Sequence, residues 1–269
     1  MPCRSHAVIV IWIWKTSGKT GWVFGRGWRK PSSDSCLFSY FLKVSMSVIH
    51  LVRHGESEAN AGLATDDPAL IALTDTGRRQ ARDLAEWFSV QPNAVMSSHY
   101  ERAKDTAQPY AERWQLPISQ DAMLHECVTL SPRIVGGTDA AARKPLVDAY
   151  WSAADPLMRH GDDSESFAEF AARVEDFRQR LDTVADGTVI FGHGLWFAML
   201  LWQLQGFTYA DSLAMCAFRR WQVALPMPNC GVYRLTGSGA DWAIRFDDAL
   251  YRRLHHGQTP VETDVMGGA

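Results

Sequence analysis

The 269-residue sequence has no apolar run long enough to cross a membrane as a helix, which needs about 20 consecutive apolar residues. The apolar stretch from Ala7 to Trp14 is much shorter than that. It also fits a signal peptide poorly, because Lys15 and Lys19 follow it and no small-residue cleavage site is evident. We therefore expect a protein that does not associate with membranes.

Cysteines and excess charge are also scarce. The chain has five cysteines and no Cys-x-x-Cys pair, which argues against a disulfide framework and against a zinc ribbon. The formal net charge is −3 at pH 7, and no long basic run indicates a nucleic-acid partner. These properties favour a cytoplasmic location and a small-molecule partner, and they leave the oligomeric state open.

Residues 1–45 differ in composition from the rest of the chain. They are rich in Trp, Ser, Gly and Lys, carry almost no acid and show no sustained periodicity. We predict an atypical extension that is either disordered or an artefact of the assigned start site, because Met46 stands just before the first convincing strand. N-terminal mass spectrometry of the native protein tests this prediction, since peptides from upstream of Met46 would contradict a start there.

From Met46 onward, strand and helix patterns alternate. Short apolar runs at 48–52, 94–96 and 188–191 are separated by amphipathic segments, and two late strands are expected at about 231–236 and 242–246. This alternation predicts an α/β fold, a three-layer α/β/α sandwich whose central sheet is mostly parallel. We assign residues 46–254 to this domain, residues 127–161 within it to an insert, and residues 255–269 to a flexible tail.

The most informative segment is Leu51-Val52-Arg53-His54-Gly55-Glu56, where a buried strand ends in an Arg-His-Gly triplet. In an open α/β sheet, ligands bind just past the carboxyl ends of the strands. Arg53 can grip an anion there with two N–H groups, and His54 can act as a nucleophile or base near neutral pH. The triplet therefore predicts a site that binds a phosphate group and attacks it. Three later strand or helix edges deliver Arg102, Glu126 and His193 in a similar way.

With these residues the chain resembles the histidine phosphatase superfamily, also called the phosphoglycerate mutase-like family. The resemblance rests on Leu-Val-Arg-His-Gly-Glu-Ser-x-x-Asn at 51–60, Leu-Thr-x-x-Gly-x-x-Gln-Ala at 73–81, Ser-Ser-x-x-x-Arg-Ala-x-x-Thr-Ala at 97–107, Leu-x-Glu at 124–126 and Gly-His-Gly at 192–194. A short Pro-Asn-Cys motif at 228–230 adds to it. Each motif alone is weak, but together they follow the family's order from about Val48 to Phe246.

The resemblance implies a role for each of these residues. His54 would be the nucleophile that becomes a phosphohistidine, and Glu126 would protonate the leaving alcohol and then activate water. Positive charge from Arg53, Arg102 and the imidazolium of His193 would stabilise the phosphoryl oxygens in the transition state. The phosphate contacts would come from Arg53, Asn60, Arg102, His193 and backbone N–H groups around Gly194. No metal and no cofactor is expected, because these cationic side chains already supply the charge.

Two reactions use this set of residues: a mutase returns the phosphoryl group to another hydroxyl, and a phosphatase lets water take it. Cofactor-dependent mutases of the family carry a longer insert after the acid motif, with Trp-Glu-Gly and Arg-Arg-Ser-Tyr-Asp-like elements. The stretch after Glu126, Cys-Val-Thr-Leu-Ser-Pro-Arg, departs from them. The resemblance thus favours a phosphomonoesterase acting on a small phosphorylated metabolite. The alternatives are a phosphoglycerate mutase and a non-catalytic phospho-ligand binder, which typically lacks the nucleophile or the acid.

Substrate choice is expected to depend on the insert at 127–161 and on the loop at 207–220, which should cover the pocket. The insert offers Arg133, Arg143 and Lys144 either as anion contacts or as ordinary surface charges. His125, beside Glu126, either lines the pocket or is structural. The partner indicated is a small phosphate ester.

Overall fold

The computed structural model describes residues 12–16, 19–23 and 46–255, and the chain divides into units 1–46 and 47–269. In the first unit, β1 (Trp12–Thr16) and β2 (Lys19–Val23) pair as antiparallel strands. The absence of sustained periodicity in residues 1–45 did not predict this pairing, although Trp and Thr, which favour strands, occur in both segments, with Ile in β1 and Val in β2. The tail from residue 256 onward lies outside the described residues. The start at Met46 stays a prediction.

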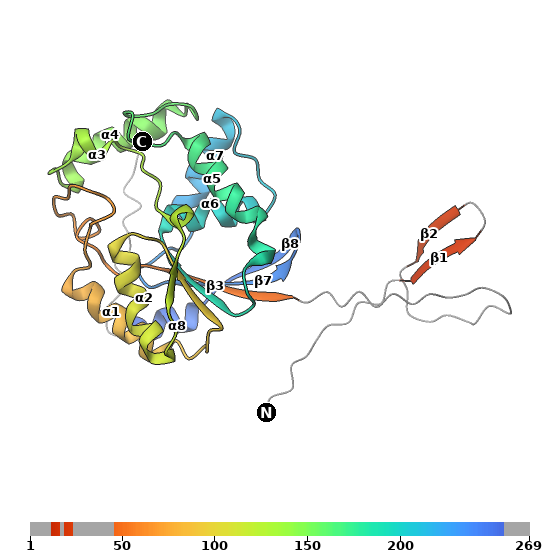
Figure 1. The fold of residues 1–269 in the computed structure, drawn as a ribbon. Coiled ribbons are helices and arrows are strands. Elements are labelled where there is room, and N and C mark those ends of the chain that lie inside the picture. Colours follow the sequence, from red (N-terminus) through yellow and green to blue (C-terminus); the bar gives the residue numbers. More distant parts are fainter. Residues whose placement is uncertain (1–11, 17–18, 24–45, 256–269) are drawn as a thin grey trace. The chain divides into compact units, whose positions relative to one another are not determined.

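The second unit is built on a six-stranded sheet with the strand order β5-β4-β6-β3-β7-β8 (Figure 1). The strands are β3 (Ser47–Arg53), β4 (Ala94–Ser97), β5 (Ile118–Gln120), β6 (Thr188–Gly192), β7 (Val232–Ser238) and β8 (Asp241–Phe246). Strands β5, β4, β6 and β3 are parallel, whereas β7 is antiparallel to β3 and β8. The predicted α/β fold with a mostly parallel sheet is confirmed.

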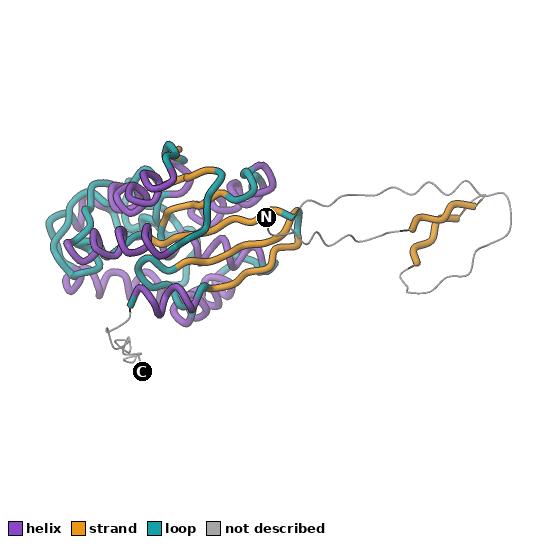
Figure 2. Tube along the Cα trace, turned by 90° about the horizontal axis from the view of Figure 1, so that it is seen from below, coloured by secondary structure: helices purple, strands orange, loops and turns teal. Residues whose placement is uncertain are grey.

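Helices cover both faces of this sheet (Figure 2). One face carries α1 (Asp75–Trp87), α2 (Glu101–Trp114) and α8 (Asp248–Leu254). The opposite face carries α4 (Ala140–Ala153), α5 (Phe167–Gln179), α6 (Gly194–Leu204) and α7 (Ser212–Ala224). Successive side chains of a strand point to opposite faces. Strand β3 therefore gives Ile49 and Leu51 to one core and Val52 to the other.

Most elements begin close to where the sequence patterns place them, but the segment 207–220 does not form the predicted loop. It contains most of α7, whose N-cap Asp211 accepts a hydrogen bond from the Ala214 N–H at 2.8 Å. Met215 and Phe218 of α7 are buried in the core. The sequence carried only a weak signal for this helix, an acidic cap followed by a narrow buried face. Three short turns of helix complete the fold: Ala122–Leu124, α3 (Pro132–Val135) and Leu181–Thr183.

The carboxyl ends of three adjacent parallel strands meet at one edge of the sheet. Arg53, the last residue of β3, pairs with Gly192, the last residue of β6, and the end of β4 lies beside β6. The start of α1 braces the loop that follows β3, because Gln80 accepts a hydrogen bond from the Glu56 N–H at 2.8 Å. A Cβ on Gly77 would lie 2.0 Å from the Glu56 carbonyl oxygen, so only glycine allows this approach. No helix in the described part of the chain is long and apolar enough to span a membrane.

Candidate functional site

His54 follows the last residue of β3, and its ring is buried. Its Nδ1 lies 2.7 Å from the Gly55 carbonyl oxygen, so we assign the ring proton to Nδ1 and the lone pair to Nε2. Arg102 donates to that Nε2 from its own Nε at 3.2 Å. Burial, with the positive charges of Arg102 and Arg53, lowers the pKa of His54 well below 6.5. The ring is therefore neutral near pH 7 and has a lone pair available at Nε2.

Two guanidinium groups lie beside this histidine. Arg102 is 6% exposed and donates to the Pro68 carbonyl at 2.7 Å, and Arg53 donates to the Met227 carbonyl. Burial lowers the pKa of Arg102 to about 10 and also lowers the pKa of Arg53, while Glu126 opposes both shifts. Arg102 therefore stays charged near pH 7. The positive charges of the two guanidinium groups exceed the negative charge of Glu126. This excess of buried positive charge favours binding of an anion.

His193 caps the start of α6 and is fully buried. Its ring centroid lies 5.3 Å from that of His54, and its Nε2 is 2.9 Å from Ser98 Oγ. His193 Nδ1 and Arg53 Nε are buried without a hydrogen-bond partner among the described residues. Burial and the charge of Arg102 lower the pKa of His193 well below 6.5, so its ring is neutral here. The imidazolium form expected from the family resemblance thus requires the charge of a bound anion.

Glu126 lies against the N-terminus of α6. Its Oε1 accepts from the N–H groups of Cys127 and Trp196, both at 3.0 Å, and its Oε2 accepts from the Leu195 N–H at 3.1 Å. The N–H groups that follow Gly194 therefore hold this carboxylate instead of facing a ligand. In the first turn of α6, the N–H of Gly194 has no partner among the described residues. A Cβ on Gly194 would lie 3.2 Å from Arg53 Nε, so this N-terminus packs directly against the guanidinium.

An ion pair that the sequence analysis did not identify holds the segment around Glu126. Arg173 of α5 binds both oxygens of Glu165 at 2.8 Å and donates to the carbonyls of Met123 and His125 at 2.7 and 2.9 Å. Burial raises the pKa of Glu165, but hydrogen bonds from His125 and Arg173 lower it by more, so that this pKa is about 2. His125 thus has a structural role, with its Nδ1 2.6 Å from the Ala122 carbonyl oxygen.

Asn60 is held by its carbonyl oxygen, which leaves its NH₂ group available as the predicted donor. Its Oδ1 accepts from the Ser57 hydroxyl and from Asn229 Nδ2, both at 3.1 Å. Asn229 Nδ2 also lies 3.1 Å from the His54 carbonyl oxygen, so it links the late 228–230 motif to the first motif. Within the described residues, no group of three His, Cys, Asp or Glu side chains is placed to hold a metal ion.

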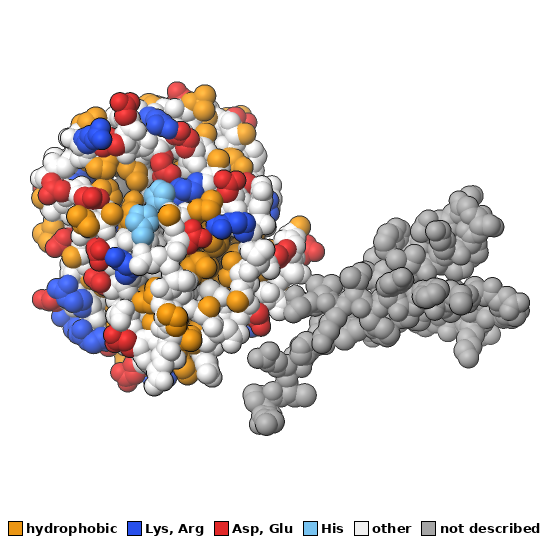
Figure 3. All heavy atoms as spheres, in the orientation of Figure 1, with side chains coloured by type: hydrophobic (Ala, Val, Ile, Leu, Met, Phe, Trp, Pro, Cys, Tyr) orange, Lys and Arg blue, Asp and Glu red, His pale blue; other side chains and the backbone are white. Residues whose placement is uncertain are grey.

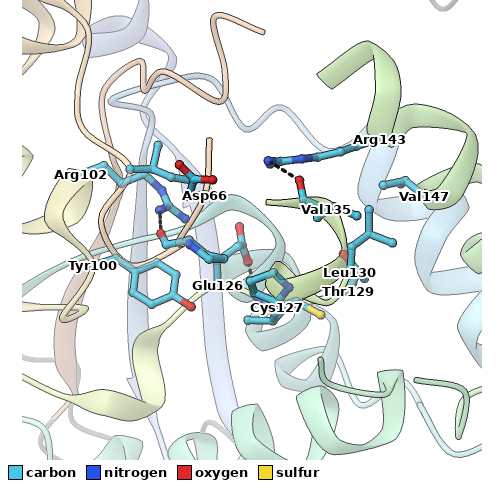
Figure 4. Close-up of a pocket in the computed structure, with 14 residues that line it drawn as sticks. Asp66, Tyr100, Arg102, Glu126, Cys127, Thr129, Leu130, Val135, Arg143 and Val147 are labelled. Carbon is cyan, nitrogen blue, oxygen red and sulfur yellow. Dashed lines mark hydrogen bonds between the residues drawn. The ribbon is translucent and has the colours of Figure 1, made fainter. Parts of the chain in front are cut away.

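A cavity of about 210 Å³ opens beside Arg102 and Glu126 (Figure 4). Residues between Cys127 and Val147 form most of its wall, whereas segment 207–220 contributes no lining residue. Of the three cationic candidates in the insert, only Arg143 lines the cavity; Arg133 lies 3.7 Å from Asp163, and Lys144 pairs with Asp148. On the face drawn in Figure 3, histidine atoms reach the surface among apolar, acidic and basic side chains, and neither charge dominates.

Residues 49–247 match the family model described as histidine phosphatase superfamily, branch 1. The chain belongs to this superfamily. The motifs that the sequence analysis identified therefore lie in a histidine phosphatase domain, and the fold brings His54, Arg53, Arg102, Glu126 and His193 to one edge of its sheet.

Known proteins resemble this histidine phosphatase over different lengths. Two uncharacterized proteins of Mycobacterium tuberculosis are 32% identical over 128 residues, which make up 47% of this chain and 61% of each relative. The probable phosphoglycerate mutase GpmB of Serratia proteamaculans is 28% identical over 205 residues, covering 73% of this chain and 88% of that protein. A solved mycobacterial glucosyl-3-phosphoglycerate phosphatase in complex with VO3 is 26% identical, with a TM-score of 0.58, covering 75% of this chain and 97% of that one.

The pH dependence of stability in this histidine phosphatase follows from its buried histidines. Burial, with the charge of Arg234, lowers the pKa of His50 to about 4, and the pKa values of His54 and His193 are also well below 6.5. The unfolded chain therefore binds more protons just below pH 6.5, so the free energy of unfolding falls as the pH falls. Between pH 6.5 and 5, urea unfolding should show a loss of up to about 1.4 kcal/mol per pH unit for each histidine.

A His50→Gln variant provides the control for this titration. Its unfolding free energy should depend less steeply on pH, by about 1.4 kcal/mol per unit, because one titrating ring is gone. Protonation of Glu165 changes the free energy of unfolding only below the pKa of its unfolded form, near 4.5, and this lies outside the range from pH 6.5 to 5. Unfolding free energies that do not change between pH 6.5 and 5 in the unmodified chain would contradict the prediction.

Proposed function

We propose that this chain is a metal-independent phosphomonoesterase that acts on a small phosphorylated metabolite through a phosphohistidine at His54. One observation carries the proposal. A neutral His54, with its proton held at Nδ1 by the Gly55 carbonyl, presents Nε2 beside the buried guanidinium groups of Arg102 and Arg53. A lone pair next to excess buried positive charge is suited to attack on a dianionic phosphate ester.

In the first step, the Nε2 lone pair of His54 attacks phosphorus, and the bond from phosphorus to the ester oxygen breaks. Arg102 transfers its Nε hydrogen bond from His54 to a phosphoryl oxygen, and the unpartnered donors of Arg53 and Gly194 bind the others. The charge of the dianion favours the imidazolium form of His193, which then donates from Nδ1. Glu126, which takes up a proton as the dianion binds beside it, gives that proton to the departing oxygen, so the products are an alcohol and phosphohistidine.

In the second step, water attacks the phosphohistidine, and the bond from phosphorus to Nε2 breaks. The Glu126 carboxylate accepts the proton of that water, and Nε2 takes back its electron pair. Inorganic phosphate and neutral His54 result. Removal of one preorganised donor around the transferring group lowers the rate by about 10²–10³.

Phosphoryl transfer of the mutase type is the alternative, supported by the 28% identity to a probable phosphoglycerate mutase. It uses the same first step and differs in the acceptor of the phosphoryl group. Incubation with 3-phosphoglycerate and 2,3-bisphosphoglycerate distinguishes the two reactions. We expect inorganic phosphate and little 2-phosphoglycerate, and efficient formation of 2-phosphoglycerate would favour the mutase.

Trapping of the intermediate tests the proposal directly. The protein is mixed with a ³²P-labelled phosphomonoester in the presence of a chelator, and the reaction is quenched rapidly. The protein should then carry label that is labile in acid and stable in base. Peptide mapping should place the label on His54, since its Nε2 carries the free lone pair. Label found on another residue, or turnover that requires added metal, would contradict this mechanism.

A further inference from the structure

We infer that the substrate is a phosphomonoester whose alcohol portion is small, largely apolar and free of negative charge. The inference rests on the proposed function and extends it to the leaving group. It comes from the composition of the cavity beside Glu126.

The alcohol portion of the substrate must lie in this cavity. Glu126 donates its proton to the ester oxygen in the proposed first step, so the departing group lies on the Glu126 side of phosphorus. Glu126 and Arg102 form one end of the cavity, and Tyr100, segment 66–71 and the insert form the rest (Figure 4). The phosphoryl group is therefore held at the sheet edge, and the alcohol portion extends toward the insert.

The wall of the cavity is mainly apolar. Half of the fourteen lining residues have side chains that offer no hydrogen bond: Ile71, Val128, Leu130, Val135 and Val147, with two prolines. The uncharged polar side chains on the lining are Tyr100, Cys127 and Thr129. At about 210 Å³ the cavity is smaller than the roughly 300–1,000 Å³ that holds a drug-sized ligand. Such a site suits an aryl or short alkyl group better than a sugar or a nucleoside, whose hydroxyls would lose their hydrogen bonds to water.

The charges on the lining disfavour an anionic leaving group. Beyond Arg102 and Glu126, which serve the reaction, the charged lining residues are Asp66 and Arg143. Four hydrogen bonds occupy Arg143: it donates to Thr138 Oγ1 and Thr65 Oγ1 at 2.9 and 2.8 Å, and to the carbonyls of Thr65 and Val135. A guanidinium has five N–H groups, so one remains, too few to bind a carboxylate through two hydrogen bonds. Asp66 has no ion-pair partner among the described residues and repels a second negative charge.

Two matched aryl esters, phenyl phosphate and its para-carboxylated analogue, test this inference. We expect the uncharged ester to be hydrolysed with a kcat/KM about tenfold higher than the carboxylated ester. The carboxylate does not make the phenol a poorer leaving group, so a lower rate reports binding in the cavity. An equal or higher kcat/KM for the carboxylated ester would overturn the inference and would make Arg143 an anion contact.

A charge reversal at the cavity wall sharpens the test. Asp66→Lys should raise kcat/KM for the carboxylated ester, relative to the uncharged ester, by about tenfold, because two units of charge change near the ligand. The control Glu86→Lys makes the same change on the exposed face of α1, away from the cavity, and should leave the ratio unaltered. A ratio that does not change in Asp66→Lys would contradict a role for this carboxylate.

The outcomes separate this inference from the proposed function. If hydrolysis of either ester survives His54→Ala, the phosphatase mechanism itself is wrong. If neither ester is hydrolysed, the inference about the leaving group is wrong, and the trapping of the intermediate decides the mechanism. If both esters are hydrolysed in a His54-dependent manner without preference for the uncharged one, the mechanism stands and the inference about the leaving group is wrong.

Discussion

Substitution of His54 by alanine should reduce kcat/KM for p-nitrophenyl phosphate by about four orders of magnitude or more, as expected for loss of a nucleophile. The Nε2 lone pair of His54 has no substitute nearby. His193, whose ring centroid is 5.3 Å away, contacts Ser98 Oγ through its Nε2 and is placed to bind phosphate. Steady-state assays in a chelator measure the loss.

The matched control is His50→Ala, which removes another buried histidine, on the strand that His54 follows. His50 lies on β3 and contacts Phe88 with a ring-centroid distance of 5.3 Å, away from the phosphate-binding groups. Its loss should lower the thermal stability while leaving kcat/KM within a few-fold of the unmodified value. A His54→Ala protein that folds normally and keeps most of its activity would exclude the phosphohistidine mechanism.

The second large effect is expected for Glu126→Gln, and its size should depend on the leaving group. With a short alkyl phosphate, kcat should fall by about 10²–10⁴, because the departing alkoxide needs a proton. With p-nitrophenyl phosphate the loss from the first step should be far smaller, because p-nitrophenolate leaves without one. The glutamine oxygen can still accept from Cys127 and Trp196, whereas the glutamine NH₂ group cannot accept from the Leu195 N–H, so two of the three hydrogen bonds are retained.

Glu58→Gln is the control for this prediction, since Glu58 follows the Arg-His-Gly triplet by three residues and could be mistaken for the acid. It should leave kcat for both esters nearly unchanged. Equal losses with the two esters in Glu126→Gln would mean that Glu126 positions α6 instead of transferring a proton in the first step.

Much of the fold could be predicted because local patterns and tertiary packing agree. The apolar runs at 48–52, 94–96 and 188–191 are strands: the first and third are buried on both faces and the second mainly on one, so none shows polar alternation. The prediction of a loop at 207–220 was wrong because the helical pattern there is weak: only Ala214, Met215 and Phe218 of α7 are buried. A helix with so narrow a buried face carries little periodic signal.

The candidate site could be predicted only as far as the motifs extend. The partners Glu165 and Arg173 lie far from Glu126 in the sequence, and only packing of α5 brings them to the 123–128 segment. The roles of the three cationic side chains in the insert also stayed open in the sequence, as anion contacts or as surface charges. Nothing local distinguishes Arg143, which closes the insert onto Thr65, from Arg133 and Lys144, which pair at the surface.

The sequence by itself determined the family of this protein: the ordered motifs specify it, and they contain the candidate histidines, arginines and acid. Only the tertiary structure decided how those groups act. It fixed the proton of His54 on Nδ1, kept His193 neutral without a ligand, and turned the N–H groups of Leu195 and Trp196 toward Glu126. Protonation and hydrogen bonding depend on burial and on distances of a few ångströms between distant segments, which residue order does not encode.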